Sequence, residues 1–225
     1  MNAAATEPDR HQTDTVHSRR AFGRYAREMS SAAAGLRPCV FLDRDDTITD
    51  TYGATKTHAV PGDMGDPTLV RLLPGVPAAL AALRRAGYTL VVFTSQGGVA
   101  RGAYSLAQVE VVNDRVREML TKELGEQPLE AIYYVPFHPT TGTDPVFTRE
   151  HDWRKPGPGM VLAAARELGL DLSRSWAVGD KPRDVQAAVN AGLARSRCFL
   201  LATSGEAGSD CADLPAAAER ILAGA

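Results

Sequence analysis

The stretch RPCVFLDRDDTITD, residues 37–50, brings several acidic side chains together at the end of an apolar run. Asp43 closes that run, and Asp45 and Asp46 follow at once. Carboxylates this close together repel one another and lose hydration when they are buried, unless a cation compensates them. A hard divalent ion such as Mg2+ prefers carboxylate and carbonyl oxygens. We therefore expect a Mg2+ site made by Asp43, the main chain at Asp45 and a further acid, Asp180.

Such a site suits the transfer of a phosphoryl group. Once a metal offsets its charge, Asp43 can attack phosphorus as a nucleophile, and Asp45 can act as a general acid and then as a base. Thr94 and Lys155 can bind the non-bridging oxygens, and Lys155 offsets the charge that builds up during transfer. The expected reaction forms an aspartyl-phosphate and then hydrolyses it.

The candidate residues stand at the ends of separate apolar runs. Thr94 and Ser95 follow YTLVVF, and Asp180 follows SWAVG, with Asp184 four residues later. Lys155 lies in RKPGPG, directly before a predicted helix. Each stretch alone also fits a plain structural interpretation, such as an acidic turn, a glycine connector, a surface loop or a helix cap. Their occurrence together, each at the end of a predicted element, favours one shared site.

The segments that position these residues alternate between strand-like and helix-like patterns. Strands are predicted at Cys39–Asp43, Tyr88–Thr94, Ala131–Val135, Ser175–Val178 and Arg197–Leu201. Helices are predicted at Val76–Ala86, Ser105–Leu124, Pro158–Leu168, Pro182–Ala191 and Pro215–Leu222. Repeated β-α-β units predict an α/β fold with three layers, α/β/α, around a Rossmann-like, mostly parallel sheet. In such sheets ligands bind at the carboxyl ends of the strands, where the candidate residues are expected.

Composition and charge narrow the class of protein. Of the 225 residues, 44% are hydrophobic and 23% are charged, and the net charge is −2, which is typical of a soluble globular domain. The lack of a basic excess argues against a nucleic-acid partner. No apolar run approaches the ~20 residues that span a bilayer, so no membrane contact is expected. Cys39, Cys198 and Cys211 lack CxxC spacing and are expected to be buried reduced thiols, which favours a cytoplasmic location.

Residues 1–36 differ in composition from the rest of the chain. They mix Arg, Ser, Thr and Ala with few large apolar residues, which predicts a poorly ordered extension with a helical turn around Phe22 to Met29. They lack the apolar core of a secretory signal, and their acids argue against a transit peptide. Residues 37–225 are expected to form one domain that is a monomer or a small homo-oligomer.

Four stretches resemble the motifs of the haloacid dehalogenase (HAD) superfamily of phosphohydrolases: FLDRDDTITD, VVFTSQGGVARG, RKPGPGM and VGDKPRDVQAA. They are similar in particular to the branch that contains D-glycero-D-manno-heptose 1,7-bisphosphate phosphatases and histidinol-phosphate phosphatases. The resemblance spans residues 38–199. It implies a Mg2+-dependent phosphomonoesterase that acts on a small phosphorylated metabolite, foremost a heptose bisphosphate that loses its 7-phosphate.

The resemblance also implies roles for residues. The nucleophile, the acid/base, the second-motif hydroxyl, the third-motif lysine and the further Mg2+ ligand fall on Asp43, Asp45, Thr94, Lys155 and Asp180. Asp184 would support the metal indirectly or through water. The intervals between the motifs hold a core strand, a helix and loops, so a capless, HAD-like enzyme with an open site is expected. Residues 51–70, rich in Gly, Pro and Asp, are either a lid that sets specificity or a plain surface loop.

Asp46 departs from the family pattern, which usually has glycine at this position. Glycine permits backbone conformations that most side chains resist, although aspartate tolerates left-handed geometry better than most residues. We expect catalysis to be retained. The alternative is that the added negative charge alters metal affinity or slows attack on an anionic substrate.

The zinc-binding loop of the branch is a second departure. That loop has Cys-x-His and later Cys-x-Cys, where this chain has Val135, Phe137, His151 and Trp153. Three of these four residues cannot bind a metal, and a structural zinc site needs about four ligands. We therefore expect no zinc, and we expect Phe137 and Trp153 to pack the loop through apolar contacts.

The candidates for substrate binding are Ser95, Gln96 and Arg101 of the second motif, Arg154 of the third and Lys181 of the fourth. Gly97 replaces a residue that usually has a side chain in the branch, which widens the pocket. Arg101 and Arg154 could bind a second anionic group of the substrate by forked hydrogen bonds, or they could be solvated surface residues.

Three alternatives to a heptose bisphosphate phosphatase stay open at this stage. Histidinol phosphate is a substrate within the same branch. Nucleic-acid 3′-end phosphatases share the motifs, although the balanced charge argues against this reading. A protein whose hydrolysis is disabled by Asp46 would only bind a phosphorylated ligand.

Overall fold

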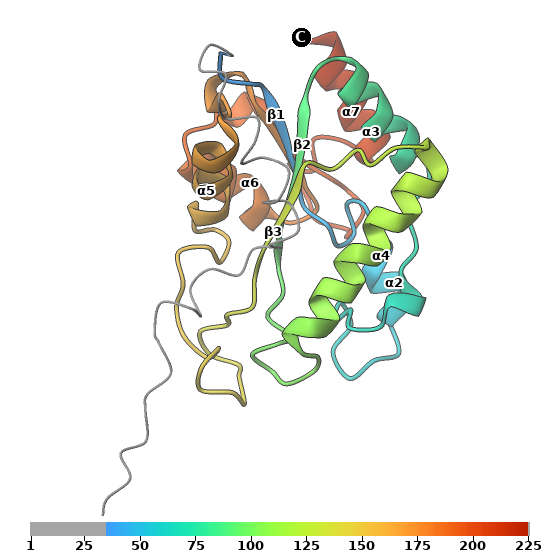
Figure 1. Cartoon of the computed structure of the whole chain (residues 1–225). Coiled ribbons are helices and arrows are strands. Elements are labelled where there is room, and N and C mark those ends of the chain that lie inside the picture. Colours follow the sequence, from blue (N-terminus) through green and yellow to red (C-terminus); the bar gives the residue numbers. More distant parts are fainter. Residues whose placement is uncertain (1–34, 225) are drawn as a thin grey trace, which may run out of the picture.

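The computed structural model describes residues 35–224. Its centre is a five-stranded sheet in the order β3-β2-β1-β4-β5, and every neighbouring pair of strands is parallel (Figure 1). The strands are β1 Cys39–Leu42, β2 Thr89–Ser95, β3 Ala131–Val135, β4 Trp176–Gly179 and β5 Cys198–Leu200. Each matches a predicted strand to within one residue at either end. The predicted α/β class is therefore confirmed.

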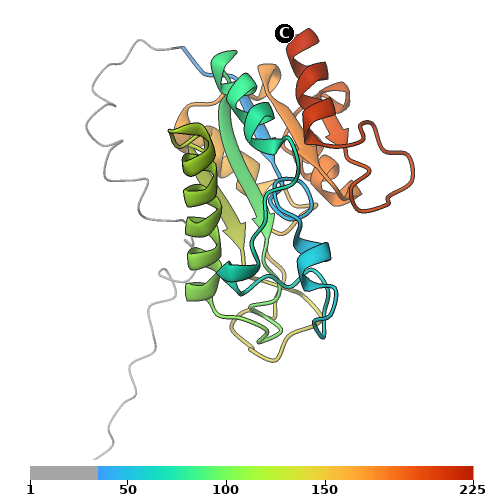
Figure 2. The same ribbon diagram turned by 90° about the vertical axis from the view of Figure 1, so that its right-hand side faces the viewer.

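Helices cover both faces of the sheet and complete the three layers. One face carries α3 Val76–Arg85, α4 Leu106–Leu124 and α7 Leu214–Ala223, and the other carries α5 Gly159–Leu168 and α6 Pro182–Asn190 (Figures 1 and 2). Successive side chains of a strand point to opposite faces. Val40 and Leu42 of β1 accordingly enter the core beneath α3, α4 and α7, whereas Cys39 and Phe41 enter the core beneath α5 and α6.

The register of the sheet brings three strand ends to the same edge. Leu42, the last residue of β1, is aligned with Val92 of β2 and with Val178 of β4. Asp43 follows Leu42, and Asp180 follows the end of β4. The two acids that are furthest apart among the predicted metal ligands therefore become neighbours through the pairing of β1 with β4.

The predicted helix ends are present where the sequence signals them. The Ser105 Oγ accepts a hydrogen bond from the N–H of Gln108 (3.2 Å), and the Gln108 side chain accepts one from the N–H of Ser105 (2.9 Å). This capping box starts α4. Gly125 ends the same helix with φ at 76°, a left-handed conformation that costs glycine little.

The segment 51–70 contains two short elements that the sequence analysis missed. They are the helix α2, Thr51–Thr55, and the 3-10 turn η1, Pro67–Leu69. Gly and Pro dominate the pattern here, and helices this short give almost no periodic signal. Within residues 35–224 no further domain interrupts the sheet and its helices, so the described core is capless.

The predicted N-terminal extension and its helical turn lie outside the described residues, apart from Gly35 and Leu36. The N–H of Arg37 donates to the carbonyl of Gly169 (3.0 Å), so Arg37 is joined to the core, and the domain boundary stays a prediction. Cys39, Cys198 and Cys211 are free and buried, as expected. In the described part of the chain, no helix combines the length and apolar character needed to cross a membrane.

Candidate active site

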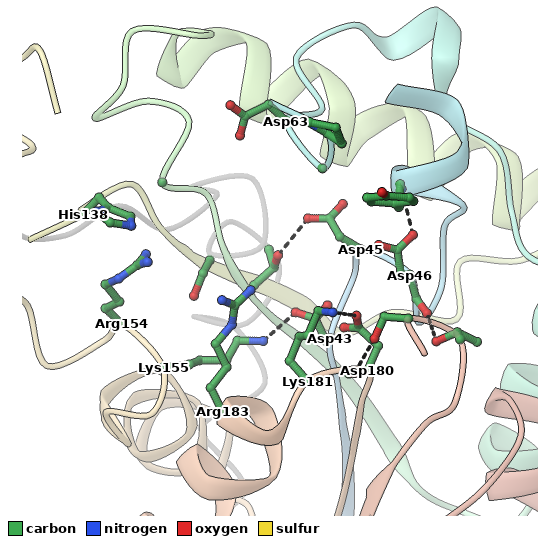
Figure 3. Close-up of a pocket in the computed structure, with 18 of the residues that line it drawn as sticks. Asp43, Asp45, Asp46, Asp63, His138, Arg154, Lys155, Asp180, Lys181 and Arg183 are labelled. Atoms are coloured by element: carbon green, nitrogen blue, oxygen red, sulfur yellow. Dashed lines mark hydrogen bonds and ion pairs between the residues drawn. The ribbon is translucent and has the colours of Figure 1, made fainter. Parts of the chain in front are cut away.

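Asp43 lies at the carboxyl end of β1 in contact with Lys155. Its backbone N–H donates to the carbonyl of Val178 (2.9 Å), which extends the pairing of β1 with β4 by one residue. Lys155 donates from Nζ to Asp43 Oδ1 (2.5 Å) and to Asp184 Oδ1 (2.7 Å), and its side chain is 1% exposed. The ammonium group also lies 4.1 Å from the centre of the Phe93 ring. The predicted nucleophile and the predicted lysine are therefore brought together (Figure 3).

Three buried carboxylates form a group that could hold a metal ion. Oxygen atoms of Asp43, Asp180 and Asp184 all lie within 4.8 Å of one another. Burial raises the pKa of Asp43, and the charges of Asp184 and Asp180 raise it further against the opposing effect of Lys155. Burial and the charge of Asp184 raise the pKa of Asp180 to about 7. One buried ammonium does not balance three buried acids, and a hard divalent cation fits this set of oxygen donors.

Asp184 is more central than its predicted supporting role implied. Its Oδ2 accepts from the N–H of Lys181 (2.9 Å) at the start of α6, while its Oδ1 accepts from Lys155. A Cβ on Gly179 would stand 2.6 Å from Asp184 Oδ2, so only glycine allows α6 to approach β4 this closely. Asp184 therefore joins the carboxylate group directly. The main chain at Asp45, which the sequence analysis placed in the metal site, stays a predicted ligand.

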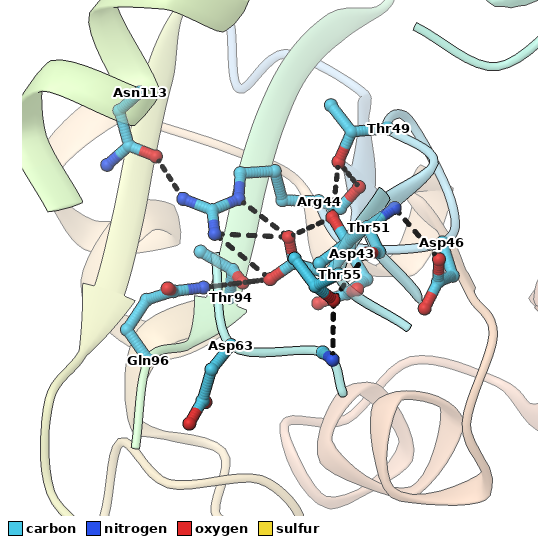
Figure 4. A network of polar contacts seen from close by, with 12 residues as sticks. Asp43, Arg44, Asp46, Thr49, Thr51, Thr55, Asp63, Thr94, Gln96 and Asn113 are labelled. Atoms are coloured by element: carbon cyan, nitrogen blue, oxygen red, sulfur yellow. Dashed lines mark hydrogen bonds and ion pairs between the residues drawn. The ribbon is translucent and has the colours of Figure 1, made fainter. Parts of the chain in front are cut away.

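A polar network that includes Arg44, Thr51 and Asn113 (Figure 4) holds the carboxylate of Asp45. Arg44 is fully buried and donates to both Asp45 oxygens, from Nε to Oδ1 and from Nη2 to Oδ2, each at 3.1 Å. Thr51 Oγ1 donates to Asp45 Oδ1 (2.7 Å), and Asn113 Oδ1 accepts from Arg44 Nη1 (2.8 Å). Burial alone would raise the pKa of Asp45, but the charge and hydrogen bonds of Arg44, with the hydrogen bonds from Thr51 and Gln96, outweigh it and lower this pKa below its ordinary value.

Some residues of the second motif line the cavity, and others are buried in the protein interior. Thr94 and Ser95 line the cavity, and the buried Ser95 Oγ has no hydrogen-bond partner among residues 35–224. Gln96, expected at the substrate, is 1% exposed and does not line the cavity. It donates from Nε2 to Asp45 Oδ2 (2.9 Å) and accepts at Oε1 from Tyr104 (3.0 Å). The structure therefore corrects the expectation for Gln96, because both ends of its amide already have partners.

Asp46 adopts the left-handed conformation that its position requires. Its φ is 57°, the single positive φ among the non-glycine residues of the described chain. Its Oδ1 accepts hydrogen bonds from the N–H groups of Thr51 (3.0 Å) and Tyr52 (2.8 Å) at the start of α2. The carboxylate is therefore engaged with that short helix, although its charge still contributes to the raised pKa of Asp180.

The carboxyl edge of the sheet opens into a cavity of about 600 Å³. Basic side chains line its outer part, namely Arg101, His138, Arg154, Lys181 and Arg183. Figure 3 shows Arg154 and His138 at one end of the cavity and Asp46 at the other, with Asp43 and Lys155 between them. A region lined by basic side chains therefore adjoins the acidic centre.

The loop that carries zinc ligands in the related branch is packed by aromatic rings here. The rings of Phe137 and His151 are stacked with centroids 4.5 Å apart, and Tyr133 and Trp153 are 6.0 Å apart. The Arg149 guanidinium lies 4.3 Å from the centre of the Phe137 ring. Phe137 and Trp153 thus pack as expected, and His151 is held in a ring stack.

Several functional candidates were missed by sequence reasoning: Arg44, Thr51, Asp63, Tyr104 and Arg183. Arg44 and Arg183 lie inside recognised motifs, so closer attention to those motifs could have found them. Thr51 and Tyr104 contact Asp45 and Gln96, which lie six and eight residues away in the chain, whereas Asp63 meets Arg101 across 38 residues, a contact that no local pattern signals.

Comparison with known proteins agrees with this geometry. A family model described as HAD-hydrolase-like matches residues 152–223. The chain is 39% identical over 161 residues to the D-glycero-beta-D-manno-heptose-1,7-bisphosphate 7-phosphatase of Mesorhizobium japonicum. The aligned region covers 70% of this chain and 67% of that protein. It is 38% identical over 156 residues to the protein of the same name from Escherichia coli, and that aligned region covers 69% of this chain and 75% of the relative.

A solved structure extends the likeness to the whole core. The D,D-heptose 1,7-bisphosphate phosphatase from B. bronchiseptica, complexed with magnesium and phosphate, superimposes with a TM-score of 0.66 and 31% identity, and the match covers 84% of this chain and 99% of that one. Fold, site and relatives together define a hydrolase of the HAD type, and the chain belongs to the HAD-like hydrolase family. Within that family it is similar to phosphatases named for heptose 1,7-bisphosphate.

Proposed function

We propose that this protein is a Mg2+-dependent phosphomonoesterase that removes the 7-phosphate of D-glycero-D-manno-heptose 1,7-bisphosphate through an aspartyl-phosphate. The contact between Lys155 and Asp43, in a cavity that Asp180 also lines and close to the buried Asp184, is the observation that supports this proposal most. The names of the relatives supply the substrate.

Asp43 is the proposed nucleophile. One of its carboxylate oxygens attacks phosphorus, a bond forms between them, and the bond from phosphorus to the sugar oxygen breaks. Lys155 and the hydroxyl of Thr94 donate hydrogen bonds to the non-bridging oxygens as negative charge builds up. A Mg2+ held by Asp43 and Asp180, together with Asp184 or with the main chain at Asp45 as the sequence suggested, would neutralise this charge when bound.

Asp45 is the proposed acid/base. Its lowered pKa favours the carboxylate in the free protein, which is the form that accepts a proton from the water that hydrolyses the aspartyl-phosphate. As an acid it must first gain a proton and then donate it to the departing sugar oxygen. An anionic phosphoryl group beside Asp45 raises its pKa, and substrate binding therefore promotes this protonation.

The substrate would be oriented by the outer part of the cavity. Arg101, Arg154 and Lys181 are proposed to face the second phosphate, while Ser95 offers a buried hydroxyl near the first. Lys181 also pairs with Glu206 (3.1 Å), whose negative charge partly offsets the positive charge that Lys181 presents to the cavity. This arrangement supports a substrate with two anionic groups over a simple monophosphate.

We further propose that the protein works without zinc, because rings occupy the loop where the branch has ligands. A cytoplasmic location, a monomeric or small homo-oligomeric state and the lack of a nucleic-acid partner stay predictions.

The decisive experiment is a phosphate-release assay on heptose, hexose, pentose and histidinol phosphates, with and without Mg2+. We expect turnover of the heptose bisphosphate that depends on Mg2+ and disappears in Asp43→Asn, with unchanged circular dichroism. Equal background release by the wild type and Asp43→Asn would refute the enzymatic proposal. Preference for histidinol phosphate would keep the mechanism and change the substrate.

A further inference from the structure

Asp63 forms an ion pair with Arg101 across the mouth of the cavity. The pair is forked: Asp63 Oδ2 accepts from Arg101 Nε at 3.3 Å, and Asp63 Oδ1 accepts from Arg101 Nη2. The Asp63 side chain is 9% exposed and the Arg101 side chain 26% exposed. Both residues line the cavity, although they belong to segments 38 residues apart.

The fork leaves one nitrogen of Arg101 available to the cavity. Asp63 occupies Nε and Nη2, and Nη1 lies beside Gly97 instead. A Cβ on Gly97 would stand 3.4 Å from Arg101 Nη1, 3.3 Å from Arg154 Nη1 and 3.1 Å from His138 Cδ2. The two guanidinium groups therefore converge on one small space, and the absence of a side chain at Gly97 keeps that space open.

Asp63 itself is held firmly by its own segment. The N–H of Gly62 donates to Thr55 Oγ1 (2.8 Å), and φ of Gly62 is 96°, which only glycine adopts readily. Met64, the next residue, is buried in the core beneath α3 and α4. A carboxylate fixed between a hydrogen-bonded turn and a core residue can set the direction of a long arginine side chain.

We propose that Asp63 is a positioning residue that orients the guanidinium of Arg101. In this orientation Arg101 and Arg154 together bind the second phosphate of a sugar bisphosphate beside Gly97. This inference rests on the proposed function and deepens it. Arg183, which lines the same cavity and has no ion-pair partner among the described residues, adds a further positive charge. The residues 51–70 then act on specificity, as one of the two sequence interpretations suggested.

The role of Asp63 depends on how it orients the Arg101 side chain, and not only on how it offsets the charge of that side chain. If Asp63 merely neutralised Arg101, its removal would strengthen binding of the second phosphate. A planar guanidinium that is held by two parallel hydrogen bonds keeps its remaining donors in one place, whereas a released arginine samples many rotamers. Loss of Asp63 is therefore expected to weaken binding of the bisphosphate.

The test compares two substrates, the heptose 1,7-bisphosphate and the heptose 7-phosphate that lacks the second group. We define selectivity as the ratio of their kcat/KM values. Asp63→Ala should lower selectivity about tenfold, through a higher KM for the bisphosphate and little change in kcat. Asp63→Asn, which keeps the shape and one acceptor, should lower it less, and Asp66→Asn, an exposed acid of the same segment, should leave it unchanged.

A double-mutant cycle separates positioning from a general structural effect. Arg101→Ala should also lower selectivity, and Asp63→Ala should then cause no further loss, because no guanidinium remains to be positioned. Unchanged or raised selectivity in Asp63→Ala and Asp63→Asn, or additive losses in the cycle, would overturn the inference. Absence of turnover of both substrates by the wild type would instead refute the proposed function.

Discussion

Arg44 holds the carboxylate of Asp45 with a fork of two hydrogen bonds, each 3.1 Å long, although the two residues are adjacent in the chain. The guanidinium is fully buried, and its third hydrogen bond goes to Asn113, which comes from α4. A neighbour in sequence thus helps to orient the proposed acid/base and favours its charged form, together with Thr51 and Gln96.

We predict that Arg44→Met destabilises the protein by roughly 3–5 kcal/mol near neutral pH, because it leaves a buried carboxylate without its cation. Because folding lowers the pKa of Asp45, this residue stabilises the folded protein at pH values above the pKa that it has in the unfolded chain. This stabilisation disappears as the pH falls through the pKa of the folded state. The difference between wild type and Arg44→Met should therefore shrink in acid. Urea unfolding at neutral and acidic pH measures it, and a difference that is equal at both values would contradict the prediction.

Asp46 combines a left-handed backbone with two hydrogen bonds to the start of α2. Asp46→Ala loses the hydrogen bonds and keeps the strained conformation, so we expect a loss of about 2–3 kcal/mol. Asp46→Gly relieves the strain and should cost about 1 kcal/mol or less. Denaturant unfolding ranks the two variants.

The same Asp46→Gly variant also tests retained catalysis. Because the Asp46 carboxylate is engaged by α2, we expect phosphate release within a few-fold of wild type. A large gain of activity in Asp46→Gly would instead favour the alternative of a protein whose hydrolysis is disabled by Asp46.

The buried carboxylates should make thermal stability depend on Mg2+. Burial and Asp184 raise the pKa of Asp180 to about 7, so its ionisation increasingly destabilises the metal-free protein as pH rises from its unfolded value through 7. At pH values above 7, Mg2+ should raise Tm by several degrees. Near pH 5 the rise should be smaller, because protons compete with Mg2+ for the carboxylates. Asp180→Asn should remove most of the rise, whereas Glu126→Gln, at an exposed position, should not. Scanning calorimetry checks this, and an equal rise in Asp180→Asn would exclude Asp180 as a ligand.

His138 offers a spectroscopic probe of the outer cavity. Burial and the charges of Arg154 and Arg101 lower the pKa of His138. A phosphate bound between these arginines would bring negative charge close to the ring and should raise that pKa. An NMR titration of Asp43→Asn with and without the heptose bisphosphate measures the change, with His138→Gln to assign the signal. A pKa that does not change would place the second phosphate elsewhere.

Much of the fold could be predicted from the sequence because its signals are local. The apolar run that ends at Asp43 and the box of Ser105 and Gln108 depend on residues close together in the chain. The sheet order was not predicted, and neither was the short helix α2. The five residues expected at the reaction centre could also be chosen beforehand, since each stands in a motif at the end of a strand or before a helix.

The sequence by itself determined the class of fold, the acids and the lysine of the site, and the departure at Asp46. Only the tertiary structure decided that Gln96 turns inward to Asp45, that Asp184 joins the carboxylate group, and that Asp63 holds Arg101. The physical reason is the distance along the chain between the residues that interact. Strand, cap and motif signals arise between near neighbours, whereas the direction of a long polar side chain depends on partners that only folding brings within hydrogen-bonding distance.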